Sequence, residues 1–232
     1  MNTELFSGKA EAYAKARPGY PEEAVDYILS LAPQGAVFAD IGAGTGKFTA
    51  LLANKGLPIF AVEPNDDMRE QLATVLSPYP NAKIIAGTAE ATTLPDHSVD
   101  VITCAQALHW FDPDGFRQEC RRIGKPGCVV VAVFNKDKVP GDSGIAYSKS
   151  STDVFFENPA LQQFSSQIAY TKEMWLTYMM SHSHSPLPSD PAYAAHMENA
   201  NAIFDRESVD GVYLMDVTTI VYSERFEEIC GG

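Results

Sequence analysis

Val-Phe-Ala-Asp-Ile-Gly-Ala-Gly-Thr-Gly-Lys-Phe, residues 37–48, is the stretch that decides the predicted fold of this 232-residue chain. An apolar run ends at Asp40 and Ile41, and glycines at positions 42, 44 and 46 follow before helical spacing resumes. Glycine leaves no Cβ between the backbone N–H groups and a ligand. The stretch therefore predicts a strand, a nucleotide-binding turn and a helix.

The glycine spacing bears on which nucleotide binds. The fingerprint of a dinucleotide-binding turn is Gly-x-Gly-x-x-Gly, whereas here the third glycine comes one residue early and Lys47 stands in its place. This weakens the interpretation as a diphosphate site. Glycines alone are weak evidence, because any tight turn from strand to helix needs them.

The next buried run, residues 58–63, supplies a second element because it ends in Glu63. Rossmann-like folds bind ribose hydroxyls with a carboxylate at this position, roughly twenty residues after the glycines. The alternative is a solvated residue beside a helix start, since Pro-Asn-Asp-Asp follows at 64–67. We favour ribose binding because the glycine loop precedes it.

Composition and charge limit the partners. Seventeen Lys and Arg against thirty Asp and Glu give a net charge of −13, which repels nucleic acid and anionic membrane surfaces. No apolar run approaches the ~20 residues that span a bilayer. The length suits one domain with an elaboration. We expect a small-molecule substrate, no nucleic acid, no membrane contact, and a monomer or homodimer.

The start of the chain and its cysteines indicate a cytoplasmic protein. Residues 1–17 carry scattered charges and no uninterrupted apolar region, so we expect no signal peptide. The cysteines, Cys104, Cys120, Cys128 and Cys230, show no Cys-x-x-Cys spacing. We therefore predict no disulfide and no zinc site.

Apolar periodicity predicts alternating strands and helices. Strands are expected over residues 37–41, 58–63, 83–86, 99–104, 128–134, 168–170 and 212–222, and helices over residues 21–31, 48–55, 67–76, 116–123, 174–180 and 193–204. Residues 142–156 are expected to form a polar insertion. This alternation predicts right-handed βαβ units and a parallel sheet that binds ligands at the carboxyl ends of its strands.

Further motifs follow in order. Gly-Thr-Ala-Glu stands at 87–90, Leu-Pro-Asp at 94–96 and Ser-Val-Asp-Val-Ile at 98–102. Together with the glycine loop and Glu63, they resemble the motifs of class I S-adenosylmethionine-dependent methyltransferases of the type 11 kind. Residues 181–186 resemble an element of the trans-aconitate methyltransferase group. The resemblance implies an α/β, Rossmann-like sheet, mostly parallel with an antiparallel last strand, and an α-helical cap.

The cofactor implied by this resemblance is S-adenosylmethionine, with S-adenosylhomocysteine as product. In such enzymes the loop holds the amino-acid end of the cofactor, and Met68, Ala89 and Glu90 would border the adenine. Many relatives carry Asp where Thr88 stands, so adenine recognition here would rest more on backbone groups and Glu90. The expected cofactor-binding residues are Tyr13, Arg17, Asp40, Gly42, Ala43, Gly44, Gly46, Glu63, Pro64, Met68, Thr88, Ala89, Glu90 and Gln106.

Two aromatic segments are candidates for contact with the substrate. Residues 106–111, Gln-Ala-Leu-His-Trp-Phe, follow the fourth predicted strand directly. We expect His109 and Trp110 near the acceptor, with His109 as a candidate general base; a structural histidine and core rings are the alternative. The residues before the first strand include Tyr13, Arg17 and Tyr20. They could close over the site, or they could form an ordinary packing arm. The expected substrate contacts are Tyr20, His109, Trp110 and Tyr147.

The prediction for the whole chain is a single methyltransferase domain. We expect an arm and helix over 1–35, the cofactor-binding core over 36–135, a helical cap over 136–210, and a final strand and tail over 211–232. The predicted reaction is methyl transfer to oxygen, including a carboxylate, or to nitrogen. A nicotinamide-dependent Rossmann oxidoreductase and a non-catalytic S-adenosylmethionine-binding protein stay open as alternatives.

Overall fold

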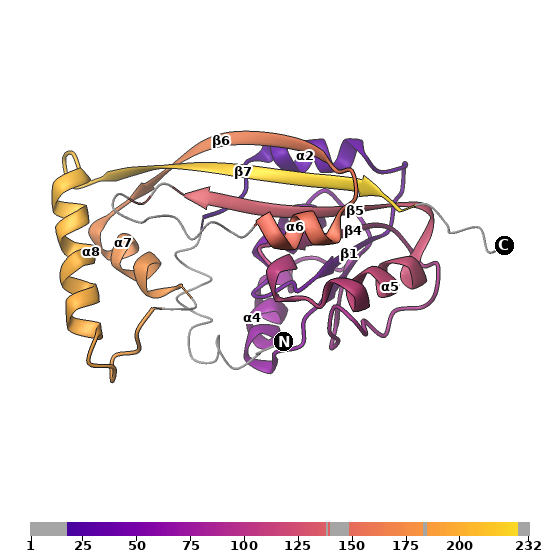
Figure 1. Cartoon of the computed structure of the whole chain (residues 1–232), viewed down its shortest axis with the longest axis horizontal. Coiled ribbons are helices and arrows are strands. Elements are labelled where there is room, and N and C mark those ends of the chain that lie inside the picture. The colour runs from indigo at the N-terminus through magenta and orange to yellow at the C-terminus, as the bar shows by residue number, and fades with distance from the viewer. Residues whose placement is uncertain (1–17, 138, 140–148, 183–184, 227–232) are drawn as a thin grey trace.

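The chain folds around one seven-stranded sheet (Figure 1). The computed structural model describes residues 18–137, 139, 149–182 and 185–226. The strand order is β3 (Ala82–Ile85), β2 (Ile59–Val62), β1 (Phe38–Ile41), β4 (Val99–Ala105), β5 (Gly124–Asp137), β7 (Tyr213–Arg225) and β6 (Ala160–Tyr170). The strands from β3 to β5 are parallel, and β7 is antiparallel to both β5 and β6. This confirms the predicted Rossmann-like sheet with an antiparallel last strand.

Local sequence sets where several helices begin. Asn65 and Asp112 are the N-caps of two of them, and their side chains accept hydrogen bonds from the backbone N–H groups of Met68 and Gly115. Pro113, which has no N–H to satisfy, occupies a first-turn position. The described helices are α2 (Glu22–Ser30), α3 (Lys47–Ala53), α4 (Asp66–Leu76), the 3₁₀ helix η2 (Leu108–Trp110), α5 (Pro113–Ile123), α6 (Lys149–Phe155), α7 (Lys172–Met180) and α8 (Tyr193–Glu207).

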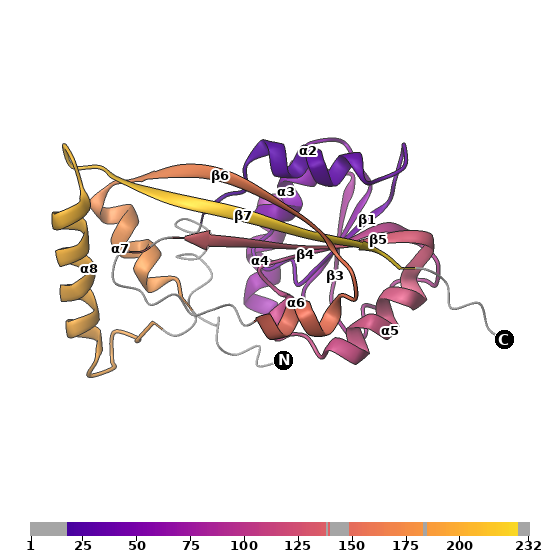
Figure 2. The same cartoon turned by 45° about the horizontal axis from the view of Figure 1, so that its top comes forward.

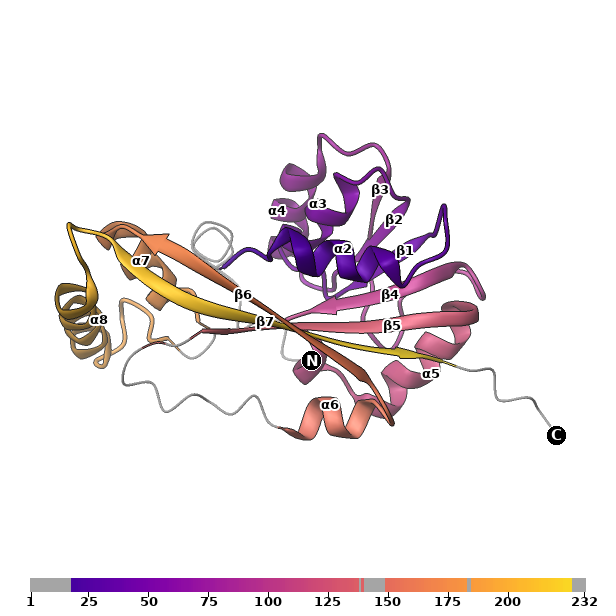
Figure 3. The same cartoon turned by 90° about the horizontal axis from the view of Figure 1, so that it is seen from above.

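Helices cover both faces of the sheet. Figures 2 and 3 show α2 and α3 on one side and α5 and α6 on the other. In β5, Val129, Val131 and Val133 pack with α2 and α3, and the alternate residues pack with α5 and α6. Because successive side chains of a strand point to opposite faces, a strand covered on both faces reads as a continuous apolar run. The run at 128–134 was predicted as a buried strand for this reason.

A long β-ribbon carries the last two helices away from the core. β6 and β7 pair along residues 160–170 and 213–223, and α7 and α8 lie at the far end of this ribbon (Figures 1 and 3). These helices form a separate apolar cluster around Trp175, whose indole N–H donates to the carbonyl of Ala200 (2.7 Å). The sequence predicted only residues 168–170 of β6, because its polar, uncharged residues show no clear alternation.

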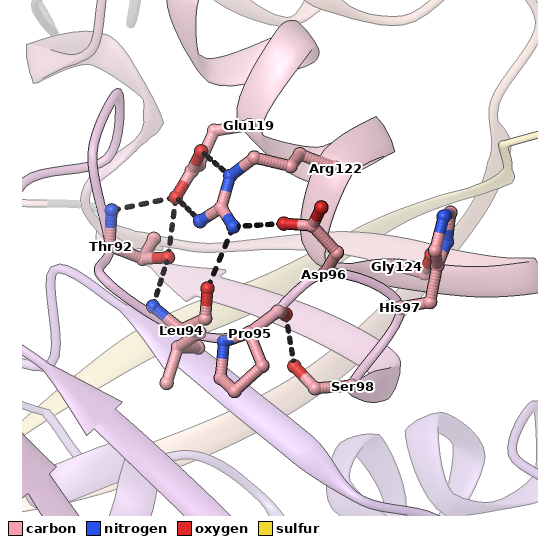
Figure 4. A network of polar contacts seen from close by, with 9 residues as sticks. All are labelled: Thr92, Leu94, Pro95, Asp96, His97, Ser98, Glu119, Arg122 and Gly124. Atoms are coloured by element: carbon pink, nitrogen blue, oxygen red, sulfur yellow. Dashed lines mark hydrogen bonds and ion pairs between the residues drawn. The ribbon is translucent and has the colours of Figure 1, made fainter.

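A network of polar groups fastens the loop after β3 to α5 (Figure 4). The buried carboxylate of Glu119 accepts from the N–H and the hydroxyl of Thr92 (2.7 and 2.5 Å) and from two guanidinium nitrogens of Arg122 (2.8 and 2.7 Å). Arg122 also donates to the carbonyl of Leu94 (2.8 Å) and to Asp96 (2.6 Å). Burial alone would raise the pKa of Glu119, but the bonds from Arg122 and Thr92 outweigh it, so its pKa is lowered.

Replacing Glu119 tests how much this network stabilises the fold. We expect Glu119→Gln to lower the free energy of unfolding by about 2–3 kcal/mol at pH 7, since charge-assisted bonds to Arg122 and Thr92 are lost. A lowered pKa contributes stability above the unfolded pKa, and this contribution is lost as pH falls through the folded pKa. The difference between the proteins should therefore shrink in acid. Urea unfolding at pH 7 and pH 3 measures it.

Asp96→Asn is the matched control, because it removes a carboxylate from the exposed side of Arg122. Exposed ion pairs contribute about 0–1 kcal/mol, so this variant should stay close to wild type. Equal losses in the two variants would contradict a special role for Glu119.

Candidate functional site

A pocket opens at the carboxyl ends of β1, β2, β4 and β5. It encloses about 1060 Å³ between the atoms, open mouth included. The pocket is lined by Pro18, Tyr20, Asp40, Gly42, Ala43, Gly44, Thr45, Lys47, Phe48, Glu63, Asn65, Met68, Ala105, Gln106, Ala107, Trp110, Phe111, Asn135 and Asp137. Crevices of this kind, outside the carboxyl ends of parallel strands, are where doubly wound folds bind ligands.

The glycine loop forms one wall of the pocket. Gly42 has a φ of +70°, and an added Cβ there would lie 2.8 Å from the Cβ of Ala107, so glycine is required by packing. Gly44 has a φ of +57°, and an added Cβ would have no neighbour within 4 Å. The backbone at Gly44 therefore borders open space, where a ligand could approach it closely.

Glu63 joins the glycine loop to the end of β2. One carboxylate oxygen accepts from the N–H of Gly44 (2.8 Å) and the other from the N–H of Asn65 (2.9 Å). The side chain is buried, and burial raises the pKa of this carboxyl although the two N–H groups partly oppose the shift. A carboxylate oxygen can accept more than one hydrogen bond. Glu63 can therefore hold the loop in place and still accept from a ligand hydroxyl.

Asp40 is the most deeply buried acid of the pocket. Its carboxylate accepts from the hydroxyls of Thr49 (2.6 Å) and Thr103 (2.9 Å), and 1% of the residue is exposed. Burial raises the pKa of Asp40 to about 6; the two hydroxyls oppose the shift and the nearby charge of Glu63 adds to it. This carboxyl consequently titrates close to neutral pH.

Several rings line the remaining walls. The Tyr20 ring meets Phe48 edge to face, with centroids 4.9 Å apart. Trp110 and Phe111 follow β4 and lie within η2 and directly after it. Met68, at the start of α4, is buried and also lines the pocket. The pocket thus combines a polar floor with apolar and aromatic sides.

The pocket lining includes nine of the residues predicted to bind cofactor or substrate: Tyr20, Asp40, Gly42, Ala43, Gly44, Glu63, Met68, Gln106 and Trp110. Other predicted residues are described but lie outside this lining: Gly46, Pro64, Thr88, Ala89, Glu90 and His109. Tyr13, Arg17 and Tyr147 lie outside the described residues, as do Cys230 and His184.

Three of the predicted residues outside the lining have contacts elsewhere in the fold. An added Cβ at Gly46 would lie 2.6 Å from Leu72, so this glycine packs against α4 behind the loop. Glu90 accepts from the backbone N–H of Asp112 (3.0 Å), the N-cap of α5. Ala89 is buried in the core beside α5. The predicted contacts of these residues with adenine stay predictions.

His109 is the middle residue of η2. It is exposed, and its ring packs beside Trp110 (4.8 Å between centroids) and Phe134 (6.5 Å). A general base must come within hydrogen-bond distance of the proton that it removes. This placement gives no support to His109 as the base, and the role stays a prediction.

Sequence analysis missed the polar residues at the ends of two elements. Asn65 follows β2 as the N-cap of α4, and Asn135 and Asp137 stand at the end of β5. A signal was available, since polar residues directly after a buried parallel strand share one edge of the sheet with the glycine loop. The remaining unpredicted lining residues are Pro18, Thr45, Lys47, Phe48, Ala105, Ala107 and Phe111.

The described residues include no cluster of reactive cysteines or metal-binding side chains. The cysteines found there, Cys104, Cys120 and Cys128, are free and buried, and burial raises the pKa of each thiol, for Cys128 to about 12. Within the described residues, no three His, Cys, Asp or Glu side chains are grouped to hold a metal ion. No helix in this part combines the length and apolar composition needed to cross a membrane.

The raised pKa of Asp40 predicts a pH-dependent stability. Because the folded state favours the protonated acid, stability from this group is complete below the unfolded pKa near 4 and is lost as pH rises to about 6. A shift of about two pH units corresponds to about 3 kcal/mol. We expect Asp40→Asn to flatten the decline between pH 4 and 6. Urea unfolding of both proteins across this range measures the difference, and parallel curves would contradict the assignment.

The chain is similar to known proteins both in sequence and in fold. A family model described as "Methyltransferase domain" matches residues 39–132. An uncharacterized methyltransferase of Mycobacterium tuberculosis is 40% identical over 130 residues, which are 56% of this chain and 51% of that protein. An uncharacterized methyltransferase-like protein of Schizosaccharomyces pombe is 35% identical over 145 residues, 60% of this chain and 56% of that one. The chain spans about half the length of these curated relatives.

Among solved structures, a candidate type II methyltransferase from Anaeromyxobacter dehalogenans has the same fold. The TM-score is 0.70, with 22% identity, over 90% of this chain and 97% of that one. The narrower resemblance of residues 181–186 to the trans-aconitate methyltransferase group stays a prediction. The resemblance of the larger motifs is confirmed: residues 39–132 match the methyltransferase domain, and the chain shares the Rossmann-like fold of solved methyltransferases.

Proposed function

We propose that this protein transfers the methyl group of S-adenosylmethionine to a small-molecule acceptor. The observation that carries the proposal is the pairing of the open backbone at Gly44 with the carboxylate of Glu63 in one pocket. The family of the matched domain supports methyl transfer. The cofactor and the acceptor are part of the proposal.

The residues of the pocket fit this cofactor chemically. Glu63 can accept from ribose hydroxyls, and the space beside Gly44 admits a group that a Cβ would exclude. Asp40, Glu63 and Asp137 against Lys47 give the described lining more carboxylates than cations, which suits a ligand with ammonium and sulfonium groups. When bound, S-adenosylmethionine supplies an electrophilic methyl group.

The protein's own contribution would be to hold the two reactants together and to keep water away from them. Positioning alone lowers the barrier for a bimolecular reaction by several kcal/mol. Tyr20 and Trp110 line the same pocket as the glycine loop and are the proposed acceptor walls. A carboxylate acceptor needs no base, whereas an alcohol, phenol or ammonium acceptor must lose a proton.

Calorimetry and a turnover assay test the proposal. S-adenosylmethionine and S-adenosylhomocysteine should release or absorb heat on binding, and NADH and NADPH should not. Metabolite extracts incubated with methyl-labelled cofactor should then give labelled product and S-adenosylhomocysteine. Binding of the nicotinamide cofactors would favour the oxidoreductase alternative. Binding without turnover in any extract would favour a non-catalytic cofactor-binding protein.

Glu63 should control cofactor affinity. We expect Glu63→Ala to weaken S-adenosylhomocysteine binding by roughly 10- to 100-fold, because charge-assisted hydrogen bonds contribute about 1.5–3 kcal/mol. Titration calorimetry measures the dissociation constant. Asp66→Asn is the matched control, since it removes one negative charge at the exposed start of α4, three residues after Glu63. Unchanged affinity in a folded Glu63→Ala protein would remove Glu63 from the site.

The pH dependence of turnover should reveal whether His109 acts as a base. From its exposed position we expect His109→Gln to lower kcat by less than about tenfold, with no rise in the wild-type rate through the ordinary histidine pKa of ~6.5. A loss of ~10²–10⁴ in kcat together with such a rise would show instead that His109 is the general base. Rate profiles of the two proteins between pH 5 and 9 separate these outcomes.

A further inference from the structure

Asn135 is the last buried residue of β5, and it joins three segments that are far apart in the sequence. Its amide oxygen accepts from the hydroxyl of Thr219 on β7 (2.6 Å), and its amide nitrogen donates to the carbonyl of Gly19 (2.9 Å). Its backbone carbonyl accepts from the side-chain amide of Gln106 (3.2 Å). Only the nitrogen can donate to the Gly19 carbonyl, so this contact fixes the orientation of the amide.

The Gly19 contact matters because residues 18–20 form a wall of the pocket. Pro18 and Tyr20 line the pocket, and residues 18–20 belong to no helix or strand. The segment is therefore outside the backbone ladder of the sheet. The Asn135 amide fastens it to the end of β5, and the Tyr20 ring rests against Phe48 of α3.

Gln106 provides an independent observation at the same place. It is not a glycine, yet its φ is +56°, directly after β4. Its N–H donates to the carbonyl of Val133 (2.8 Å) and its side chain donates to Asn135, so two bonds from β5 hold the unusual backbone. Such strained residues persist where their surroundings fix them, and they cluster at functional sites.

We propose that Asn135 is a positioning residue of the pocket. By holding residues 18–20 and Gln106 against the end of β5, it fixes this wall of the pocket before a ligand arrives. A wall that is already in place costs less conformational entropy on binding than one that must be ordered. The effect on ligand affinity rests on the proposed function, whereas the effect on residues 18–20 does not.

Asn135→Asp tests this role with little change of shape. The carboxylate can still accept from Thr219, but it cannot donate to Gly19 and it repels that carbonyl. In the ligand-free protein, hydrogen exchange at Gly19 and Tyr20 should become at least several-fold faster. The dissociation constant of S-adenosylhomocysteine should rise roughly 3- to 10-fold, as expected for one lost hydrogen bond. In acid the protonated carboxyl can donate again, so the ratio of variant to wild-type dissociation constants should return toward one.

Thr219→Val is the matched control, because it removes the other hydrogen bond of the same amide and leaves the Gly19 contact. Exchange at Gly19 and Tyr20 should stay at the wild-type rate in this variant. If Asn135→Asp does not fold, Asn135→Ala repeats the comparison without the added charge, and it should show faster exchange with no recovery in acid.

The proposal is overturned if exchange at Gly19 and Tyr20 is unchanged in a folded Asn135 variant. It is also overturned if Thr219→Val accelerates exchange equally, since the effect would then be a general loosening of β5 and β7. Failure of the proposed function is a separate result. In that case the wild-type protein binds no S-adenosylhomocysteine, while the exchange experiment still reports on Asn135.

Discussion

The contact between the Glu63 carboxylate and the N–H groups of Gly44 and Asn65 is the constraint on which the pocket depends. The loop after β1 contains three glycines with positive φ, so its own backbone does not restrict it to one shape. A buried carboxylate from the neighbouring strand supplies the restriction. It links the ends of β1 and β2 and leaves the loop backbone facing open space beside Gly44.

The burial of carboxylates at this edge of the sheet has an energetic cost that the surrounding groups reduce. Asp40 lies between two threonine hydroxyls and Glu63 between two backbone N–H groups, and burial still raises both pKa values. Carboxyl groups whose pKa is shifted by burial and by charged neighbours cluster at functional sites. At Glu119, by contrast, the guanidinium of Arg122 outweighs burial and the pKa is lowered. That carboxylate stabilises the fold.

The pocket is built from strands that lie far apart in the sequence. The glycine loop and Glu63 come from the first two strands, whereas Gln106 and Asn135 come from β4 and β5. Asn135 also contacts Thr219 of β7, the strand that begins at the α7 and α8 cluster (Figure 1). Parallel pairing in the order β2, β1, β4, β5 brings these residues to one edge although 72 positions separate Glu63 from Asn135. This convergence explains why one buried amide can affect a wall formed by residues 18–20.

The sequence by itself determined the class of fold and the core of the site. Local patterns sufficed for these, because a strand buried on both faces reads as an apolar run and a tight turn needs glycine. The loop at residues 42–46 and Glu63 were predicted in this way, and Met68 was predicted from the family resemblance. Tertiary structure alone decided the length of β6, whose polar sequence is held in place by pairing with β7 rather than by alternation. It also decided that His109 is exposed and absent from the described lining and that Asn135 joins residues 18–20, because burial and contacts over long sequence separation depend on how the strands pair.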